Sequence, residues 1–242
     1  MTGRGIVVAV DGPSGTGKST VSRQVASRLQ LSYLDTGAMY RAATWWSLHE
    51  GVELDDQAAV AAVVRAMPLE MITDPHDPHV VCAGTDITED IRAKELTEVV
   101  SKIATNLEVR AELKRLQREI LAQEARDGRS AGAGVVAEGR DITTVVAPDA
   151  DVRILLTASE STRLARRAKE RHGVADLATI EATRDEVLRR DADDSTVSNF
   201  MTAADGVLTI DTSELDISQV VEGVLGAIAD HTTCAHSEEA AR

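Results

Sequence analysis

The 242-residue chain has little of several features that would point to other classes of protein. It contains two cysteines, Cys82 and Cys234, with no CxxC or metal-ligand spacing, so we expect two free thiols in a reducing compartment. It has no run of about 18 apolar residues, which is the length that spans a bilayer. Its first residues lack the cleavage pattern of a signal peptide. These absences favour a cytoplasmic protein that has no membrane partner.

Positive charge is also scarce. The chain has 26 Lys and Arg against 40 Asp and Glu, which gives a formal net charge of -14. This balance argues against unspecific binding to nucleic acid or to an anionic membrane, so an anionic ligand would need a locally basic pocket. One basic cluster lies between Glu160 and Arg190, and it contains Arg163, Arg166, Arg167, Lys169, Arg171, Arg184, Arg189 and Arg190. The cluster is either a solvated helix face or part of such a pocket.

Short apolar segments alternate with helical patterns along most of the chain. The segments typical of buried strands are Ile6–Val10, Tyr33–Leu34, Val135–Ala137, Val152–Leu156 and Val207–Ile210. The helical patterns cover Lys18–Leu29, Gly37–Glu50, Asp55–Ala66, Lys94–Ala104, Glu108–Ala125, Ser161–His172, Thr179–Ala192 and Ile217–Ala229. This alternation predicts an α/β fold with a parallel sheet and flanking helices. Without repeats or a low-complexity linker, residues 1–230 are expected to form one domain.

Two segments depart from the alternation. Residues 68–92 contain two β-like pieces, Leu69–Thr73 and His79–Cys82, with a Pro-rich turn between them and a third piece near Thr85–Ile87. We expect a small antiparallel insert, which is either a decorated loop or a flap on the substrate side. Residues 231–242 are polar and have no apolar period, so we expect a flexible C-terminal tail.

The stretch GPSGTGKST, residues 12–20, follows the first apolar segment and precedes an amphipathic helix. It matches G-x-x-x-x-G-K-[ST], in which glycines let successive N–H groups turn inward around an anion. In this pattern the lysine reaches the β- and γ-phosphates and the serine hydroxyl is a ligand of Mg²⁺. The residues predicted to bind ATP are Gly12, Pro13, Ser14, Gly15, Thr16, Gly17, Lys18, Ser19 and Thr20, with Ser19 on the metal.

Other P-loop classes fit the chain less well. A GTPase would need an Asn-Lys-x-Asp element that reads guanine, and the sequence has none. A helicase or motor ATPase would need many more residues. A kinase that acts on a small molecule remains.

Two further segments are candidates for the acceptor side. Thr36 follows the second apolar segment, where it is placed to cap the next helix, and Arg41 lies on the first turns of that helix. Arg41 is either a surface charge or an arginine that binds a phosphate through two hydrogen bonds. We expect both residues near the carboxyl edge of the sheet, where ligands of open α/β folds bind.

The segment Val135–Asp141 ends in Glu138, Gly139, Arg140 and Asp141 at the same predicted edge. Glu138 could hold a water bound to Mg²⁺, Arg140 a phosphate, and Asp141 the amine of a base. The alternative interpretation is a buried salt bridge between Arg140 and Asp141, which would bear the cost of burying two charges.

Four ordered motifs, DGPSGTGKST, YLDTGAMYRA, EGRDITTVV and RRDADDS, resemble the bacterial cytidylate kinase family of P-loop nucleoside monophosphate kinases. The resemblance extends from about Ile6 to Ala229. It implies transfer of a phosphoryl group from ATP to CMP or dCMP with Mg²⁺, in a monomer. It also implies that the insert at residues 68–92 enlarges the monophosphate-binding region and that a lid at about residues 159–174 closes over ATP.

The same resemblance implies roles for individual residues. The acceptor would be bound by Thr36, Arg41, Ser101, Arg110, Arg140, Asp141, Arg190 and Asp194, with Ser101, Arg110 and Asp141 on the cytosine edge. Because two polyanions must meet, the transferring group would be neutralised by Mg²⁺ and by the residues Lys18, Arg140, Arg163, Arg166 and Arg167. The resemblance places Arg171 in or beside the lid as well.

The chain departs from the family pattern at three positions. Glu138 stands where the family usually has Asp, Thr143 where it has Gly, and Val197 where it often has a basic residue. The contact of that basic residue is either missing or supplied by Arg184 or Arg189. The interpretations that remain beside a cytidylate kinase are a kinase for UMP, AMP or a small metabolite, and a nucleotide-binding switch without catalysis.

Overall fold

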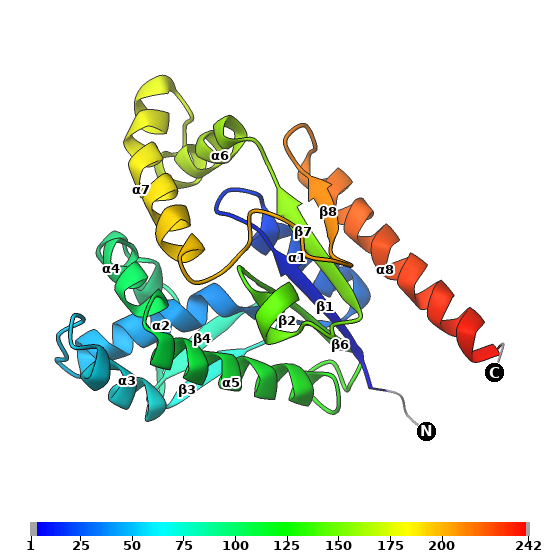
Figure 1. The fold of residues 1–242 in the computed structure, drawn as a ribbon, viewed down its shortest axis with the longest axis horizontal. Coiled ribbons are helices and arrows are strands. Elements are labelled where there is room, and N and C mark those ends of the chain that lie inside the picture. Colours follow the sequence, from blue (N-terminus) through cyan, green and yellow to red (C-terminus); the bar gives the residue numbers. More distant parts are fainter. Residues whose placement is uncertain (1–3, 241–242) are drawn as a thin grey trace.

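The computed structural model describes residues 4–240 and centres on a five-stranded sheet with the strand order β2-β6-β1-β7-β8 (Figure 1). The strands are β1 (Ile6–Asp11), β2 (Ser32–Asp35), β6 (Gly134–Gly139), β7 (Val152–Thr157) and β8 (Leu208–Asp211). All neighbouring strands are parallel, so their carboxyl ends meet at one edge of the sheet. The predicted α/β architecture with a parallel sheet is confirmed.

Helices cover both faces of this sheet and enclose two hydrophobic clusters. On one face, α1 (Lys18–Leu29) and α8 (Ile217–Ala240) bury residues such as Val25 and Val224 against β1 and β7. On the other face, α2 (Thr36–His49), α5 (Leu107–Glu124) and the π-helix η2 (Ile142–Val146) bury residues such as Met39 and Leu113. The sheet is apolar on both faces because the alternate side chains of its strands enter the two clusters.

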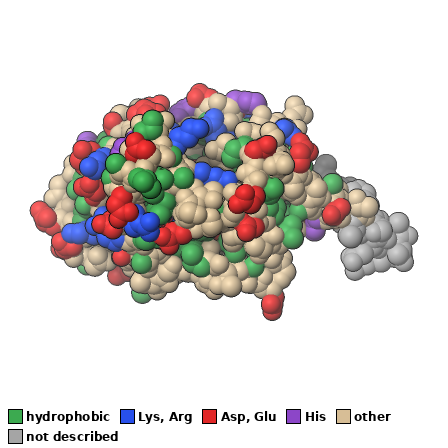
Figure 2. Space-filling model, turned by 90° about the horizontal axis from the view of Figure 1, so that it is seen from above, with side chains coloured by type: hydrophobic (Ala, Val, Ile, Leu, Met, Phe, Trp, Pro, Cys, Tyr) green, Lys and Arg blue, Asp and Glu red, His purple; other side chains and the backbone are tan. Residues whose placement is uncertain are grey.

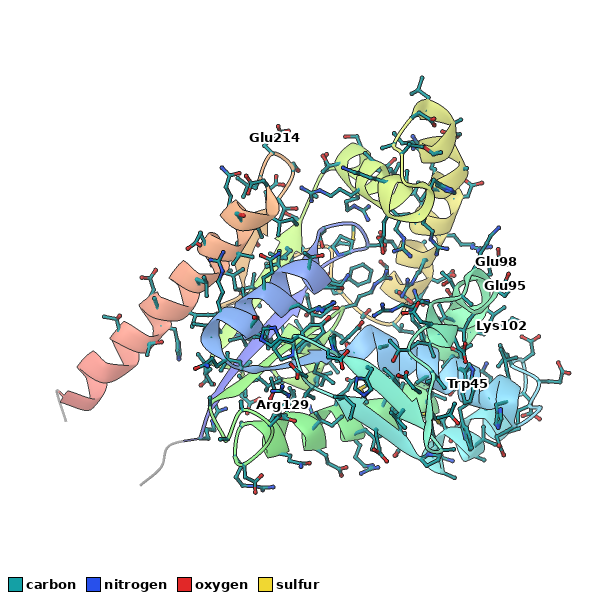
Figure 3. All side chains as sticks on the ribbon, turned by 180° about the vertical axis from the view of Figure 1, so that it is seen from behind. Trp45, Glu95, Glu98, Lys102, Arg129 and Glu214 are labelled. Carbon is teal, nitrogen blue, oxygen red and sulfur yellow. The ribbon has the colours of Figure 1, made fainter. Side chains whose placement is uncertain are left out.

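The remaining helices are α3 (Gln57–Arg65), the short η1 (Asp90–Arg92), α4 (Lys94–Ala104), α6 (Glu160–His172) and α7 (Leu177–Ser195). Charged side chains of α4 face outward, with Glu95, Glu98 and Lys102 at the surface (Figure 3). The α6–α7 pair stands beside the phosphate loop (Figure 1).

The predicted antiparallel insert is confirmed. Its strands β3 (Leu69–Ile72), β4 (His79–Cys82) and β5 (Thr85–Asp86) pair in the order β3-β4-β5. The end of β3 is anchored to the main domain because the buried carboxylate of Glu124 accepts hydrogen bonds from Ser32 Oγ at 2.6 Å and Thr73 Oγ1 at 2.8 Å. The backbone N–H of Tyr33 also donates to the Thr73 carbonyl at 2.8 Å. The insert is therefore tied to β2, the strand that precedes Thr36.

Some helix ends differ from expectation. Asp35, and not Thr36, caps α2, since its side chain accepts from the Ala38 N–H, whereas the Thr36 hydroxyl donates to the Glu138 carbonyl at 2.8 Å. The helix α8 was expected to end at Ala229 before a flexible tail but runs to Ala240. The segment 230–240 has no glycine or proline, so the helical backbone continues although its apolar stripe has ended.

Two observations bear on the cysteines and on membranes. Cys82 is a buried free thiol, and burial raises its pKa, while the side chain of Cys234 lies outside the described residues. Within residues 4–240, no helix has the length and hydrophobicity needed to cross a membrane.

Candidate active site

A cleft of about 1100 Å³ opens at the carboxyl edge of the main sheet, between the phosphate loop, the insert and α7. Figure 2 shows Lys and Arg side chains around the hollow in this face, among Asp and Glu side chains at the surface. Lys18 and nine arginines line the cleft against five carboxylates. In a chain of net charge -14, this is the locally basic pocket that an anionic ligand requires.

The phosphate loop connects β1 to α1 and forms one wall of the cleft. Gly15 and Gly17 have φ angles of +83° and +89°, which residues with side chains rarely adopt. A Cβ atom on Gly15 would also lie 2.6 Å from the carbonyl oxygen of Arg163. Lys18 is the first residue of α1, and burial lowers the pKa of its amine. The loop therefore presents backbone N–H groups, a helix N-terminus and a buried amine to the cleft.

Beside the loop, two hydroxyl groups converge on one carboxylate. Ser19 Oγ and Tyr33 OH donate to the same oxygen of Glu138, Oε1, at 2.6 Å and 3.2 Å. Burial raises the pKa of Glu138 to about 7, and the charge of Asp35, its register partner on β2, adds to that rise. Serine and carboxylate oxygens are the hard ligands that Mg²⁺ prefers, so this donor set fits a Mg²⁺ ion that keeps several waters.

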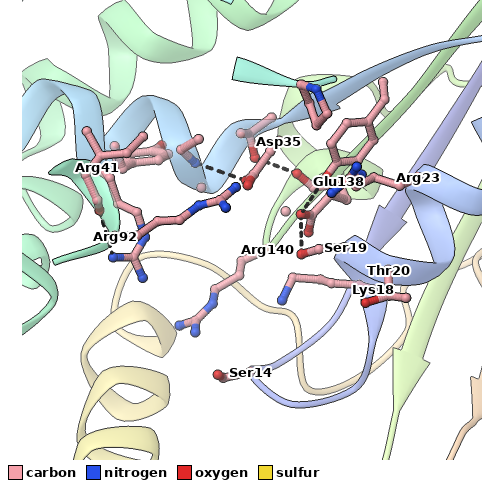
Figure 4. Close-up of a pocket in the computed structure, with 18 of the residues that line it drawn as sticks. Ser14, Lys18, Ser19, Thr20, Arg23, Asp35, Arg41, Arg92, Glu138 and Arg140 are labelled. Atoms are coloured by element: carbon pink, nitrogen blue, oxygen red, sulfur yellow. Dashed lines mark hydrogen bonds between the residues drawn. The ribbon is translucent and has the colours of Figure 1, made fainter. Parts of the chain in front are cut away.

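Four arginines border one space within the cleft, and they are Arg41, Arg92, Arg140 and Arg190. Arg41 and Arg92 lie on the side away from the phosphate loop, and Arg140 lies between them and Lys18 (Figure 4). Arg41 Nη1 donates to Thr97 Oγ1 at 2.8 Å, which holds its guanidinium toward the cleft (Figure 4). Arg92 is exposed at the end of η1 and enters from the same side (Figure 4). Burial, together with repulsion from Arg140 and Arg41, lowers the pKa of Arg190 to about 9. An anion in this space would relieve that repulsion.

At the back of the cleft, Arg110 on α5 forms an ion pair with Asp141. Arg110 also donates to the Ala104 carbonyl at 3.1 Å, and its guanidinium lies 5.7 Å from the ring centre of Tyr40. Burial raises the pKa of Asp141, and Arg110 partly opposes this rise. The pair offers fixed donors and an acceptor to a planar polar ligand.

The alternative pairing of Arg140 with Asp141 is not what the structure shows. Arg140 pairs with Asp191 at 3.0 Å and with Asp194, while Asp141 pairs with Arg110. Both charges are therefore compensated by other partners. Arg140 still lines the cleft, where an incoming anion can reach it.

Most residues predicted for the site meet in this cleft. Those that line it are Ser14, Gly15, Gly17, Lys18, Ser19, Thr20, Thr36, Arg41, Arg110, Glu138, Arg140, Asp141, Arg167, Arg190 and Asp194. Those that lie outside its lining are Gly12, Pro13, Thr16, Ser101, Arg163 and Arg166. The P-loop residues among the second group shape the loop from behind, as when Thr16 Oγ1 donates to the Pro13 carbonyl at 3.1 Å.

Arg163 and Arg166 were expected to act on the transferring group, but the structure places them elsewhere. Arg163 is 4% exposed and bonds to Asp191 and to the Ser14 carbonyl. Arg166 donates to the hydroxyl and the carbonyl of Thr212 at 2.9 Å and 2.6 Å. Their guanidinium groups are therefore engaged in protein contacts, because α6 packs directly against the phosphate loop.

The residues of this region that were not expected from the sequence include Tyr33, Asp35, Arg92, Thr97 and Asp191. Asp35 ends the short strand β2 and directly precedes the predicted site residue Thr36. Its position at the carboxyl end of a strand was the signal in the sequence that could have identified it. Arg92 and Thr97 carry no motif, and their place depends on how the insert folds back over α2.

A family model and relatives from other bacteria agree on one family. The model of the family described as "Cytidylate kinase" matches residues 8–230. A cytidylate kinase from Streptomyces avermitilis is 44% identical over 226 residues, which is 93% of each chain. One from Nocardia farcinica is 46% identical over 228 residues, covering 93% of this chain and 94% of the relative. Among solved structures, shikimate kinase from Acinetobacter baumannii in complex with shikimate aligns over 95% of this chain and 94% of its own, with 17% identity and a TM-score of 0.40.

Proposed function

The chain belongs to the cytidylate kinase family, and from that premise we propose that its cleft transfers the γ-phosphoryl group of ATP to CMP or dCMP. The products are ADP and CDP or dCDP. The observation that carries the proposal is that a phosphate loop and a group of arginines line one cleft. The loop with Lys18 forms one wall, Arg41 and Arg92 lie on the far side, and Arg140 and Arg190 line the space as well (Figure 4).

On the donor side, we assign the triphosphate to the loop that begins at Gly12. Backbone N–H groups of the loop and the N-terminus of α1 bind the phosphate oxygens, and Lys18 reaches the β- and γ-phosphates. Ser19 and Glu138 would hold Mg²⁺, the glutamate through a bound water. When bound, Mg²⁺ supplies positive charge that offsets the charge of the transferring group.

On the acceptor side, we assign the phosphate of CMP to the space between the four arginines. The acceptor oxygen belongs to a phosphate monoester whose second pKa is around 6, so it is largely ionised near neutral pH and needs no general base. Catalysis then rests on alignment and charge neutralisation. Arginines suit this task because a guanidinium binds phosphate oxygens through two parallel hydrogen bonds.

The base is assigned to the Arg110–Asp141 pair. Asp141 can accept from the exocyclic amine of cytosine, while Arg110 can donate to its ring nitrogen and carbonyl. Uracil carries a carbonyl in place of the amine and would face the Asp141 carboxylate, which repels it. Asp194 and Arg190 are assigned to the sugar and phosphate.

The helices α6 and α7 bring Arg167, Arg171 and Arg190 to the cleft. We propose that this pair is the lid, and that its closure excludes water, which competes for the γ-phosphoryl group. All these residues come from one chain, so the proposed site is complete in a monomer. The reaction would take place in the cytoplasm, where both nucleotides are available.

A panel of acceptors tests the proposal. ADP release is measured with ATP, Mg²⁺ and each of CMP, dCMP, UMP and AMP. We expect the highest kcat/KM for CMP and dCMP. Preference for UMP or AMP would assign the cleft to another monophosphate. Tight ATP binding without turnover on any acceptor would indicate a nucleotide-binding switch.

A further inference from the structure

One buried carboxylate outside the cleft joins the donor and acceptor walls. Asp191 lies near the end of α7, is 5% exposed and does not line the cleft, so it is not placed to touch either nucleotide. Its two carboxylate oxygens nevertheless contact three different parts of the chain. These parts are the phosphate loop, α6 and the segment that follows β6.

On the donor side, Asp191 and Arg163 together hold the tip of the phosphate loop. Asp191 Oδ2 is paired with Arg163 Nη1, and the same nitrogen donates to the Ser14 carbonyl at 3.1 Å. The Ser14 N–H points to Asp191 Oδ1 at 3.4 Å. The backbone of Arg163 also packs against Gly15 so closely that a Cβ atom there would lie 2.6 Å from the Arg163 carbonyl oxygen. Both polar groups of the Ser14 backbone are thus held from the α6–α7 side.

On the acceptor side, Asp191 Oδ1, the oxygen that faces the Ser14 N–H, also contacts Arg140, which is one of the four arginines that border the space in the cleft. Asp191 Oδ1 is 3.0 Å from Arg140 Nη2. The other arm of this guanidinium, Nη1, contacts Asp194 and the Arg190 carbonyl, and its face lies 4.8 Å from the ring centre of Phe200. Several separate contacts therefore fix the orientation of Arg140, and Asp191 provides the one that also reaches the loop.

We propose that Asp191 is a positioning residue that aligns the donor loop with Arg140, so that the two phosphates meet in line. This inference rests on the proposed function. A single carboxylate is suited to the task because the Ser14 N–H and Arg140 Nη2 both contact the same oxygen, Oδ1, so these two groups cannot shift independently while both remain bonded to it. Arg163 completes the connection between the loop and α6.

The proposal predicts an unusual split between binding and turnover. Both nucleotides are anions, so removing a negative charge near their sites should leave their binding unchanged or make it tighter. Misalignment of reacting groups by about 1 Å can reduce a rate by about 100-fold. Loss of Asp191 should therefore lower kcat by about 10- to 100-fold without weakening the binding of either nucleotide.

The first variant is Asp191→Asn, which keeps the size of the side chain and removes its charge. Binding of CMP, and of an ATP analogue with an uncleavable β,γ bridge together with MgCl₂, is measured by calorimetry, and kcat is measured by ADP release. Asp185→Asn is the matched control, because Asp185 lies on the same helix and is exposed. We expect the control to behave as wild type.

A second variant separates alignment from simple charge balance. Asp191→Asn leaves Arg163 as a buried cation without its carboxylate, which could by itself disturb the fold. The double variant Asp191→Asn/Arg163→Met removes this imbalance. The reference is Arg163→Met alone, because this change by itself removes the bond to the Ser14 carbonyl. If Asp191 only balances the charge of Arg163, the double variant should have the kcat of Arg163→Met, whereas alignment through Asp191 predicts a lower kcat in the double variant.

The outcomes decide as follows. A low kcat in Asp191→Asn, and a kcat in the double variant below that of Arg163→Met, with dissociation constants for both ligands equal to wild type or lower, support the positioning role. Equal kcat in the double variant and Arg163→Met overturns it, as does a kcat within about threefold of wild type in Asp191→Asn. Wild-type protein that binds CMP without phosphorylating it would refute the proposed function itself, before any variant is made.

Discussion

The Arg110–Asp141 pair leads to a quantitative prediction about the choice of base. The variant Asp141→Asn keeps the size of a side chain that is 7% exposed and removes the charge that Arg110 contacts. One carboxylate oxygen is replaced by an N–H₂ group. The change therefore affects hydrogen bonding to Arg110 and to the base, and leaves the phosphate loop untouched.

The magnitude follows from the hydrogen bond between Asp141 and the cytosine amine, because the pair with Arg110 is present with and without CMP. A hydrogen bond to a charged group contributes about 1.5–3 kcal/mol and one between neutral groups about 0.5–1.5 kcal/mol, so this bond weakens by about 1–1.5 kcal/mol. Since 1.4 kcal/mol is a factor of ten, kcat/KM for CMP should fall by about 5- to 12-fold.

The assay compares CMP and UMP under the same conditions. The side-chain amide introduced by Asp141→Asn can donate to the carbonyl that uracil has in place of the amine, so the CMP/UMP ratio of kcat/KM should fall by at least as much as kcat/KM for CMP. The KM for ATP should stay within about threefold of wild type. Asp149→Asn is the control, because Asp149 is exposed and close in sequence. A kcat/KM for CMP within about threefold of wild type, or an unchanged CMP/UMP ratio, would refute the assignment of the base.

Further predictions concern the phosphates and the metal-side carboxylate. Lys18→Ala should abolish turnover, as measured by ADP release, because it removes the amine assigned to the transferring group. Arg41→Ala should raise the KM for CMP by about 30-fold or more, from the loss of about 2 kcal/mol or more of charge-assisted hydrogen bonding, with little change in the KM for ATP; an unchanged KM for CMP would contradict the acceptor assignment. The pKa of Glu138 is raised from 4.5 to about 7, so its ionised form destabilises the metal-free fold. As the pH rises from about 4.5 to 7, wild type should lose up to about 3 kcal/mol of stability relative to Glu138→Gln. Urea unfolding in EDTA at several pH values measures the free energy of unfolding of both proteins. The same pH dependence of this free energy in wild type and Glu138→Gln would refute the prediction.

Much of the fold could be predicted because local signals and tertiary structure agree. The helices Lys18–Leu29 and Lys94–Ala104 have the bounds expected from their apolar period. The ends of other elements depend on capping, which the period does not report. Asp176 and Thr179 form a capping box, for example, so α7 begins at Leu177 and not at Thr179.

The candidate site was predictable where its residues belong to contiguous motifs, as the phosphate loop and Arg140–Asp141 do. It was not predictable where contacts join distant segments. The resemblance implied that Arg163 and Arg166 act on the transferring group, yet α6 packs against the phosphate loop and their guanidinium groups bond to Ser14, Asp191 and Thr212 instead. Asp191 was missed for the same reason, since its partners come from three separate parts of the chain.

The two hydrophobic clusters on opposite faces of the sheet have a consequence for how such a protein can diverge. The helix that follows the phosphate loop packs in one cluster, whereas α2 and α5, which carry Arg41 and Arg110, pack in the other. The sheet separates the two, so changes that reshape the acceptor pocket repack only one side. A lineage of such enzymes can therefore exchange one phosphate acceptor for another while the phosphate loop and the helix that follows it stay unchanged.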